Sequence, residues 1–202
     1  MKIICIGRNY AEHARELNND VPESPVFFMK PDTALLLKNN PFFYPDFTED
    51  LHFETEIVLK IAKNGRHIEP AFADRYFNEI SVGIDFTARD LQSKCKAKGL
   101  PWEIAKAFDQ SAPTGTFIDI TSLSNENINF WLDINGERRQ TGNTKDMIFS
   151  FNQIIAYVSK FVTLRIGDYI FTGTPAGVGP TKIGDHFEAF LEGKKLLDFH
   201  VK

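Results

Sequence analysis

The sequence predicts an α+β fold that is predominantly β. The first observation is the alternation of residues 51–62 between two faces, which is the period of a strand. The second is the pair Asn135-Gly136 directly after a strand-like segment, a strong cue for a β-hairpin. The third is that the helical patterns are few and do not alternate strictly with strands, which argues against a doubly wound or barrel α/β fold.

The composition indicates a single folded domain over residues 1–202. A chain of 202 residues and 23.0 kDa is long enough to bury a core, and it has no linker-like stretch or internal repeat. The net charge is −4, and its 23 basic and 27 acidic residues are well mixed, so nucleic acid is not the expected partner. We expect a small molecule or a second copy of the chain instead.

The chain shows no segment that would bind or cross a membrane. Its N-terminal apolar run is shorter than the apolar region of a signal peptide, and no window approaches 18 consecutive apolar residues. Two cysteines, Cys5 and Cys95, are too few for a disulfide scaffold or a cysteine-based zinc site. We therefore expect a cytoplasmic protein.

In the first half, short strands and helices are expected in turn. Residues 3–6 are an apolar strand, and Asn9 is expected to cap a helix over 11–17. A second strand over 26–29 is stopped by Lys30-Pro31.

After the strand over 51–62, a weak helical pattern covers residues 67–80 and a strand follows over 81–86. Residues 87–98 are then predicted to form a helix that is opened by Thr87 and closed by Gly99.

The second half is rich in strand and turn signals. The hairpin at 135–136 follows a strand over 129–134, and the one long helical pattern here covers 146–160. Gly-Asp turns precede strands at 169–172 and 186–191.

Three carboxylates are candidates for a metal site. Glu54 and Glu56 are two apart on a predicted strand, so both project from one face about 7 Å apart. Such a pair suits a hard divalent cation, although a polar strand face in solvent has the same pattern. Asp85, near the end of the apolar run 81–86, is the candidate third ligand, and its alternative role is to cap the helix that follows.

Two further groups could take part in chemistry. His13 and Glu16 are spaced i, i+3 and share a helix face, which would let a carboxylate orient a histidine base, or they form an ordinary surface pair. Lys106 is flanked by apolar residues, which would either bury its ammonium against an anion or let it extend to water.

Two more segments have the chemistry of a ligand pocket. Arg89 and Gln92 share a helix face and could hold a carboxylate, although solvated helix residues look the same. The loop 172–180 is rich in Gly and Pro but has no Gly-Lys-Ser/Thr, so it is not a phosphate-binding loop. It fits a tight loop that brings backbone amides and Thr hydroxyls to a ligand.

In their order along the chain, these segments resemble the fumarylacetoacetate hydrolase family, in its short branch of acylpyruvate hydrolases and oxaloacetate decarboxylases. The resemblance covers nearly the whole chain and is carried by GRNYAEHARE (7–16), FFMKP (27–31), HFETE (52–56), GIDFTARDLQ (83–92), KGLPWEIAKAFD (98–109), NGERRQTGNTKDMIF (135–149) and GDYIFTGTPAGVGP (167–180).

The resemblance implies the family's mixed β-roll with short helices, a Mg²⁺ or Mn²⁺ site and a homodimer. It implies the following roles: metal ligands Glu54, Glu56 and Asp85; a water-activating pair His13 and Glu16 on a segment that orders over substrate; an active-site lysine, Lys106; and substrate-binding residues Lys30, Arg89, Gln92 and Thr174.

The implied reaction is the hydrolysis of a C–C bond in acylpyruvates (2,4-dioxo acids), which releases pyruvate and a carboxylic acid. The alternatives are an oxaloacetate decarboxylase or a keto–enol tautomerase of the same family, and third a non-catalytic binding protein on this fold. A pyruvate enolate is common to hydrolysis and decarboxylation, and only hydrolysis needs an attacking water. His13 and Glu16 therefore favour the hydrolase.

Overall fold

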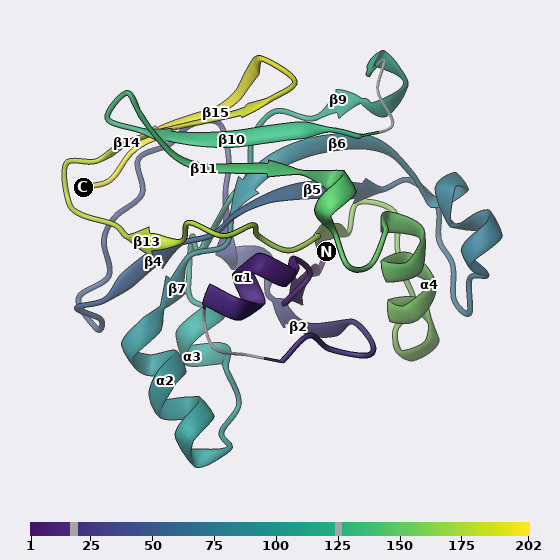
Figure 1. Cartoon of the computed structure of the whole chain (residues 1–202), viewed down its shortest axis with the longest axis horizontal. Helices are drawn as coiled ribbons and strands as arrows, with labels where there is room; N and C mark the ends of the chain where they lie inside the picture. Colours follow the sequence, from purple (N-terminus) through teal and green to yellow (C-terminus); the bar gives the residue numbers. More distant parts are fainter. Residues whose placement is uncertain (17–19, 124–126) are drawn as a thin grey trace.

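A six-stranded sheet forms the centre of the protein (Figure 1). The computed structural model describes residues 1–16, 20–123 and 127–202. Strands β1 and β12 of this sheet are parallel and all its other neighbours are antiparallel. In spatial order the strands are β2 (Val26–Lys30), β1 (Ile3–Gly7), β12 (Tyr169–Phe171), β5 (Thr55–Ile61), β6 (Phe77–Ile84) and β9 (Ile118–Asp119).

A four-stranded antiparallel sheet lies against the first. The predicted hairpin at Asn135-Gly136 is confirmed, and both residues have the positive φ angles, 55° and 79°, that a type I′ turn requires. The strands are, in order, β11 (Glu137–Asn143), β10 (Asn129–Ile134), β14 (His186–Leu191) and β15 (Lys194–His200).

Two small sheets complete the β structure. They consist of β13 (Gly179–Pro180), β4 (Leu51–Phe53) and β7 (Thr87–Ala88), and of β3 (Leu35–Leu36) with β8 (Ala112–Pro113).

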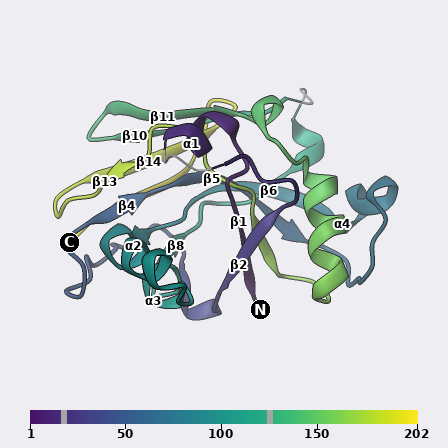
Figure 2. The same ribbon diagram turned by 60° about the horizontal axis from the view of Figure 1, so that its bottom comes forward.

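The helices are short and lie at the margins of the sheets. Figures 1 and 2 show α2 and α3 together on one side of the molecule and α4 beside the segment around η2 on another. No helix in the described part of the chain is both long and apolar enough to span a membrane. The α-helices are α1 (Ala11–Glu16), α2 (Arg89–Lys98), α3 (Glu103–Lys106) and α4 (Phe151–Phe161), and the 3₁₀ helices are η1 (Asp32–Ala34), η2 (Pro70–Tyr76), η3 (Ile120–Ser122) and η4 (Thr144–Asp146).

The main core lies between the six-stranded and four-stranded sheets. Ile57, Val82 and Ile84 from the first sheet belong to one buried cluster with Phe130 and Phe187 from the second. The other face of β5 packs through Val58 in a second buried cluster. Strand β5 is therefore buried on both faces, and its alternating pattern does not mark an exposed face. The predicted α+β, predominantly β fold is confirmed.

Three predicted elements differ in detail. The strand expected over 51–62 is broken at Glu54 into β4 and β5. The helix expected over 67–80 is only the 3₁₀ helix η2, because pairing with β5 draws the chain into β6 from Phe77 onward. The helix expected over 146–160 begins at Phe151, where Ser150 and Gln153 form a capping box.

Asn9 does not cap α1, contrary to the sequence prediction. Its side chain is buried and joins two distant loops: Nδ2 donates to the carbonyls of Phe149 at 3.0 Å and Thr172 at 2.8 Å. Its Oδ1 accepts the N–H of Phe149 at 2.7 Å. Of the predicted helix 11–17, residue 17 lies outside the described residues.

Candidate active site

The break between β4 and β5 sets the position of the candidate metal ligands. The carbonyl of Glu54 accepts the backbone N–H of Asp85 at 2.8 Å, so the two residues are held next to each other although 31 positions separate them. Glu54 is 6% exposed, and Glu56 and Asp85 are each 1% exposed. A solvent-facing strand is therefore excluded, and Asp85 does not cap α2, whose N-cap residue is Ala88.

The three carboxylates converge. One oxygen from each of Glu54, Glu56 and Asp85 lies within 4.8 Å of the others. Oδ1 of Asp85 is buried and accepts no hydrogen bond, and the Lys30 ammonium lies beside it. A buried set of carboxylate oxygens matches the preference of Mg²⁺ and Mn²⁺ for hard oxygen ligands. The residues present therefore fit a divalent cation.

Lys106 lies among these carboxylates. From the end of α3, its Nζ donates to Glu54 Oε2 and Asp85 Oδ2, both at 2.8 Å, and to Thr87 Oγ1 at 2.6 Å. Burial lowers the pKa of Lys106, but Asp85 and Glu54 outweigh it and raise the pKa to about 12. In the metal-free site, Lys106 is thus a cation that the two carboxylates stabilise.

Lys30 supports Asp85 from outside the pocket. Its buried Nζ donates to the carbonyl of Ser111 at 2.8 Å, to Ser111 Oγ at 3.0 Å and to the carbonyl of Phe86 at 3.2 Å. The same Nζ lies 2.7 Å from Asp85 Oδ1, but not along a hydrogen-bonding direction. Lys30 therefore contacts Asp85, a candidate metal ligand, and is not one of the residues that line the pocket.

Arg89 and Gln92 form a connected pair at the start of α2. Arg89 Nη1 donates to Gln92 Oε1 at 2.8 Å, and Nη2 donates to Glu54 Oε1 at 2.6 Å. Burial raises the pKa of Glu54, but the Lys106 and Arg89 cations prevail and hold it well below its usual range. Glu54 is therefore ionised.

Glu56 has no salt-bridge partner among the described residues. Its Oε2 accepts the backbone N–H of Gly173 at 2.7 Å. Burial raises the pKa of Glu56, and the Asp85 and Glu54 carboxylates raise it further. Among the described residues, Glu56 is therefore the one carboxylate of the three without an adjacent cation, which a bound divalent cation would supply.

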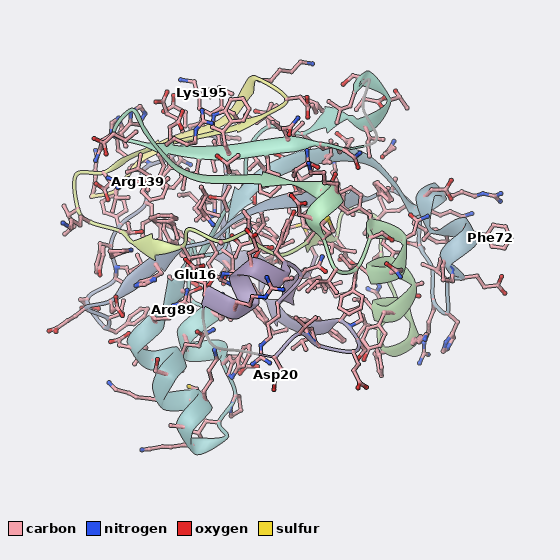
Figure 3. All side chains as sticks on the ribbon, in the orientation of Figure 1. Glu16, Asp20, Phe72, Arg89, Arg139 and Lys195 are labelled. Carbon is pink, nitrogen blue, oxygen red and sulfur yellow. The ribbon has the colours of Figure 1, made fainter. Side chains whose placement is uncertain are left out.

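His13 and Glu16 form the predicted pair on α1. His13 Nδ1 lies 3.2 Å from Glu16 Oε2, and Glu16 also accepts the backbone N–H of Gly177 at 3.1 Å. Figure 3 shows Glu16 on α1, with Arg89 labelled nearby at α2. His13 is buried and Glu16 is exposed, so only the carboxylate of the pair is at the surface. Nδ1 faces Glu16. When Nδ1 carries the ring proton, Nε2 has a free lone pair and can accept a proton from a ligand.

One pocket joins most of these groups. Its lining includes His13, the three carboxylates, Arg89, Gln92, Lys106 and Thr174, together with Ile6, Gly7, Arg8, Val26, Phe28, Lys96 and Trp102.

The loop after β12 brings Thr174 to this pocket, and its hydroxyl accepts a hydrogen bond from Gln140 Nε2 at 2.9 Å. Sequence reasoning missed Gln140, because a glutamine on a hairpin strand carries no signal of a buried contact. It also assigned no role to Arg8 or Lys96. Their signal is weak, since Arg8 is a single basic residue in a turn and Lys96 is one of three lysines, at 94, 96 and 98, on the same helix.

A mixed β fold with three buried carboxylates in one pocket is typical of enzymes that act on small molecules. The model of the fumarylacetoacetate (FAA) hydrolase C-terminal domain matches residues 2–202. The chain therefore belongs to the fumarylacetoacetate hydrolase family.

Named relatives span nearly the whole chain. The chain is 44% identical to the mitochondrial oxaloacetate tautomerase FAHD1 of Bos taurus over 99% of this chain and 91% of that protein. It is 41% identical to the mitochondrial oxaloacetate decarboxylase of Dictyostelium discoideum, over 95% of this chain and 89% of that protein. A crystal structure of fumarylpyruvate hydrolase from Pseudomonas aeruginosa, in complex with Mn²⁺ and pyruvate, superposes with a TM-score of 0.94 at 37% identity, covering 100% of this chain and 89% of that one.

The expectation of a cytoplasmic protein is wrong by this comparison, since the similar proteins from Bos taurus, Mus musculus and Homo sapiens are named as mitochondrial. It rested on the lack of a long apolar segment. A mitochondrial transit peptide is amphipathic and rich in Arg and Ser, so an apolar-run criterion does not bear on that compartment.

Proposed function

We propose that this protein is a divalent-metal-dependent enzyme that hydrolyses a C–C bond in acylpyruvates, releasing pyruvate and a carboxylic acid. The observation that carries the proposal is the His13–Glu16 pair, whose histidine lines the same pocket as the three carboxylates. A base next to a cation site is the apparatus that water attack on a carbonyl requires.

Mg²⁺ or Mn²⁺ would be held by Glu54, Glu56 and Asp85. When bound, such a cation supplies electrophilic stabilisation of negative charge on substrate oxygens. The structure of the similar Pseudomonas aeruginosa fumarylpyruvate hydrolase, which contains Mn²⁺ and pyruvate, supports this assignment. So does the fit of the buried carboxylate oxygens described above.

The remaining residues divide the work of the reaction. His13 takes a proton from water, and Glu16 holds the imidazole and stabilises its cationic form. The water oxygen bonds to the distal carbonyl carbon, the C–C bond breaks, and its electron pair remains on the pyruvate enolate. The Lys106 ammonium stabilises this developing charge, and the enolate then takes up a proton to give pyruvate.

Arg89, Gln92 and Thr174 are the proposed contacts for the substrate's own oxygens, since all three line the pocket. Lys30 is a proposed substrate ligand by resemblance. Its contacts support a different role, in which it positions Asp85.

Oxaloacetate tautomerisation or decarboxylation is the second candidate. The relatives that carry these two names are 41–44% identical to this chain, a higher identity than that of the hydrolase structure. Both reactions pass through an enolate that the same cations would stabilise, and neither needs an attacking water.

We further propose that residues 1–202 act as one catalytic domain, that the partner is a small 2-oxo acid, and that the chain forms a homodimer. The family match over residues 2–202 supports the single domain.

Steady-state assays of the purified protein decide among these reactions. Acetylpyruvate, fumarylpyruvate and oxaloacetate are each supplied with Mg²⁺, with Mn²⁺ and after exhaustive chelation. We expect metal-dependent release of pyruvate from an acylpyruvate. Turnover of oxaloacetate alone would replace the hydrolase by the second candidate, and full activity after chelation would refute the metal requirement.

A further inference from the structure

Two cations in the pocket have no counter-charge. Lys106, Lys30 and Arg89 each lie against a carboxylate of the cluster, whereas Arg8 and Lys96 form no salt bridge in the described part of the chain. Both nevertheless line the pocket that holds the cluster. Positive charge that the protein leaves unpaired at a binding pocket is available to an anionic ligand.

The backbone and an aromatic ring hold these cations where they are. Arg8 has a φ of 61°, a left-handed conformation that a residue with a Cβ adopts at a conformational cost, and such residues concentrate at functional sites. Lys96, on α2, lies over the ring of Trp102 with Nζ 5.6 Å from the ring centroid, and Trp102 lines the same pocket. Burial and the nearby Arg89 and Arg8 cations lower the pKa of Lys96.

The two cations come from different elements than the carboxylates do. Arg8 follows β1 and precedes α1, the helix that carries His13, while Lys96 lies on α2 two turns beyond Arg89. Neither forms a salt bridge with a carboxylate of the cluster although both line its pocket, and Arg8 lies near enough to Lys96 to lower the pKa of that lysine. A ligand whose 2-oxo acid end is at the cluster would present its far end to them.

We infer that Arg8 and Lys96 bind the distal carboxylate of the substrate, so that the site selects dicarboxylic 2-oxo acids over monocarboxylic ones of the same length. This inference rests on the proposed function, because it places the 2-oxo acid end of the substrate at the carboxylate cluster. Decarboxylation removes the charge of the distal carboxylate, so cations that pair with it stabilise the ground state over the transition state. Hydrolysis and tautomerisation retain that charge.

The first test measures binding without turnover. Isothermal titration in the presence of Mg²⁺ compares 2-oxoglutarate with 2-oxopentanoate, which differ in the distal carboxylate and share the same number of carbons. We expect the wild type to prefer the diacid, and Lys96→Gln and Arg8→Gln each to weaken diacid binding about tenfold, the value of a charge-assisted hydrogen bond, with little effect on the monoacid. Lys94→Gln, on the same helix and outside the pocket lining, is the matched control and should bind like the wild type.

The second test follows the two fates of oxaloacetate in the same variants. The ratio of decarboxylation to enol–keto conversion should rise in Lys96→Gln relative to both the wild type and Lys94→Gln, a change that loss of structure would not produce. Equal losses for diacid and monoacid, or an unchanged ratio, would overturn this inference and leave the proposed function standing. If the wild type with Mg²⁺ bound neither acid and turned over no 2-oxo acid, the proposed function and this inference would both fail.

Discussion

Gln140 Oε1 accepts the backbone N–H of Thr55 at 2.9 Å. Thr55 lies between the metal-ligand candidates Glu54 and Glu56, whereas Gln140 belongs to β11 of the other large sheet. The amide nitrogen of Gln140 donates to Thr174 Oγ1 at 2.9 Å and to the carbonyl of Pro175 at 3.0 Å. One buried side chain therefore fixes the ligand-bearing strand and the pocket loop relative to each other.

Replacing this side chain should destabilise the protein and loosen the site. Gln140→Leu keeps a similar volume but leaves the Thr55 N–H unpaired in the core, at about 1–3 kcal/mol, and removes the donor to Thr174 and Pro175. Denaturant unfolding should show this loss, with Arg139→Gln as the control because Arg139 is an exposed neighbour on β11. A stability of Gln140→Leu within about 0.5 kcal/mol of the wild type would contradict the assigned role.

The sequence was most informative where a feature is local. The Asn135-Gly136 hairpin and the His13–Glu16 pair each depend on neighbouring residues, and both occur in the structure as predicted. The ordered family motifs also identified the three carboxylates, which the fold does bring together.

Features that depend on distant contacts could not be predicted. Asn9 has the residue type of a helix cap, but its hydrogen bonds go to Phe149 and Thr172, more than 130 positions away. The alternation over 51–62 was also compatible with a polar face in solvent, whereas six of the seven residues of β5 are buried. Nothing local to Gln140 indicates that it reaches Thr55.

Glu56 should be required for metal binding but not for the stability of the metal-free protein. Glu56→Gln keeps an acceptor for the Gly173 N–H and removes a charge that lies beside Asp85 and Glu54, so the metal-free Tm should not fall. Calorimetric titration with Mg²⁺ or Mn²⁺ should show much weaker binding, and the Tm increase on adding metal should disappear. Glu137→Gln, at an exposed site, should match the wild type.

The same carboxyl predicts how metal binding depends on pH. Because the pKa of Glu56 is raised in the metal-free protein, a proton competes with the metal for this group. Metal affinity should therefore fall as the pH is lowered through that raised pKa, and binding should release protons. An affinity in the wild type that does not change with pH would argue against Glu56 as a ligand.

Lys106 should matter for both charge balance and catalysis. Lys106→Met leaves Glu54 and Asp85 without their shared cation, but Arg89 still pairs with Glu54 and Lys30 with Asp85. The free energy of unfolding should therefore fall by less than the about 3–5 kcal/mol of a fully broken buried ion pair. Mg²⁺ should then raise the Tm of Lys106→Met by more than it raises that of the wild type, because the cation takes over the charge. Lys98→Met, an exposed position on α2, serves as the control. Equal metal-induced shifts in both proteins would show that Lys106 and the metal do not share the same carboxylates.

The chain should be a dimer in solution. Several large apolar side chains remain exposed in one copy, among them Phe43 at 61% and Ile183 at 70%. Both lie in loops whose neighbours, Phe42 and Gly184, hydrogen-bond to residues 200 and 201 near the C-terminus. Sedimentation at micromolar concentration should give twice the 23.0 kDa of one chain, and a single species of 23.0 kDa would refute the dimer.

The His13–Glu16 pair separates the two candidate reactions. If hydrolysis is the reaction, His13→Ala removes the base that takes a proton from water and should lower acylpyruvate hydrolysis by roughly 10²–10⁴-fold. Oxaloacetate decarboxylation should suffer less, because its bond breaks without a nucleophile and depends on the cations around Glu54 and Asp85. Lys106→Ala should impair both reactions, since both develop the same enolate charge.

The measurement is a comparison of the two substrates at fixed Mg²⁺ for the wild type, His13→Ala and Lys106→Ala, with metal affinity determined for each. His67→Ala is the matched control, because His67 is exposed and does not line the pocket. Equal loss of both activities in His13→Ala, with metal binding intact, would mean that the pair does not primarily activate water. His13 would then act on a step that both substrates share, such as proton transfer at the enolate carbon, and the tautomerase or decarboxylase would be the better description of this protein.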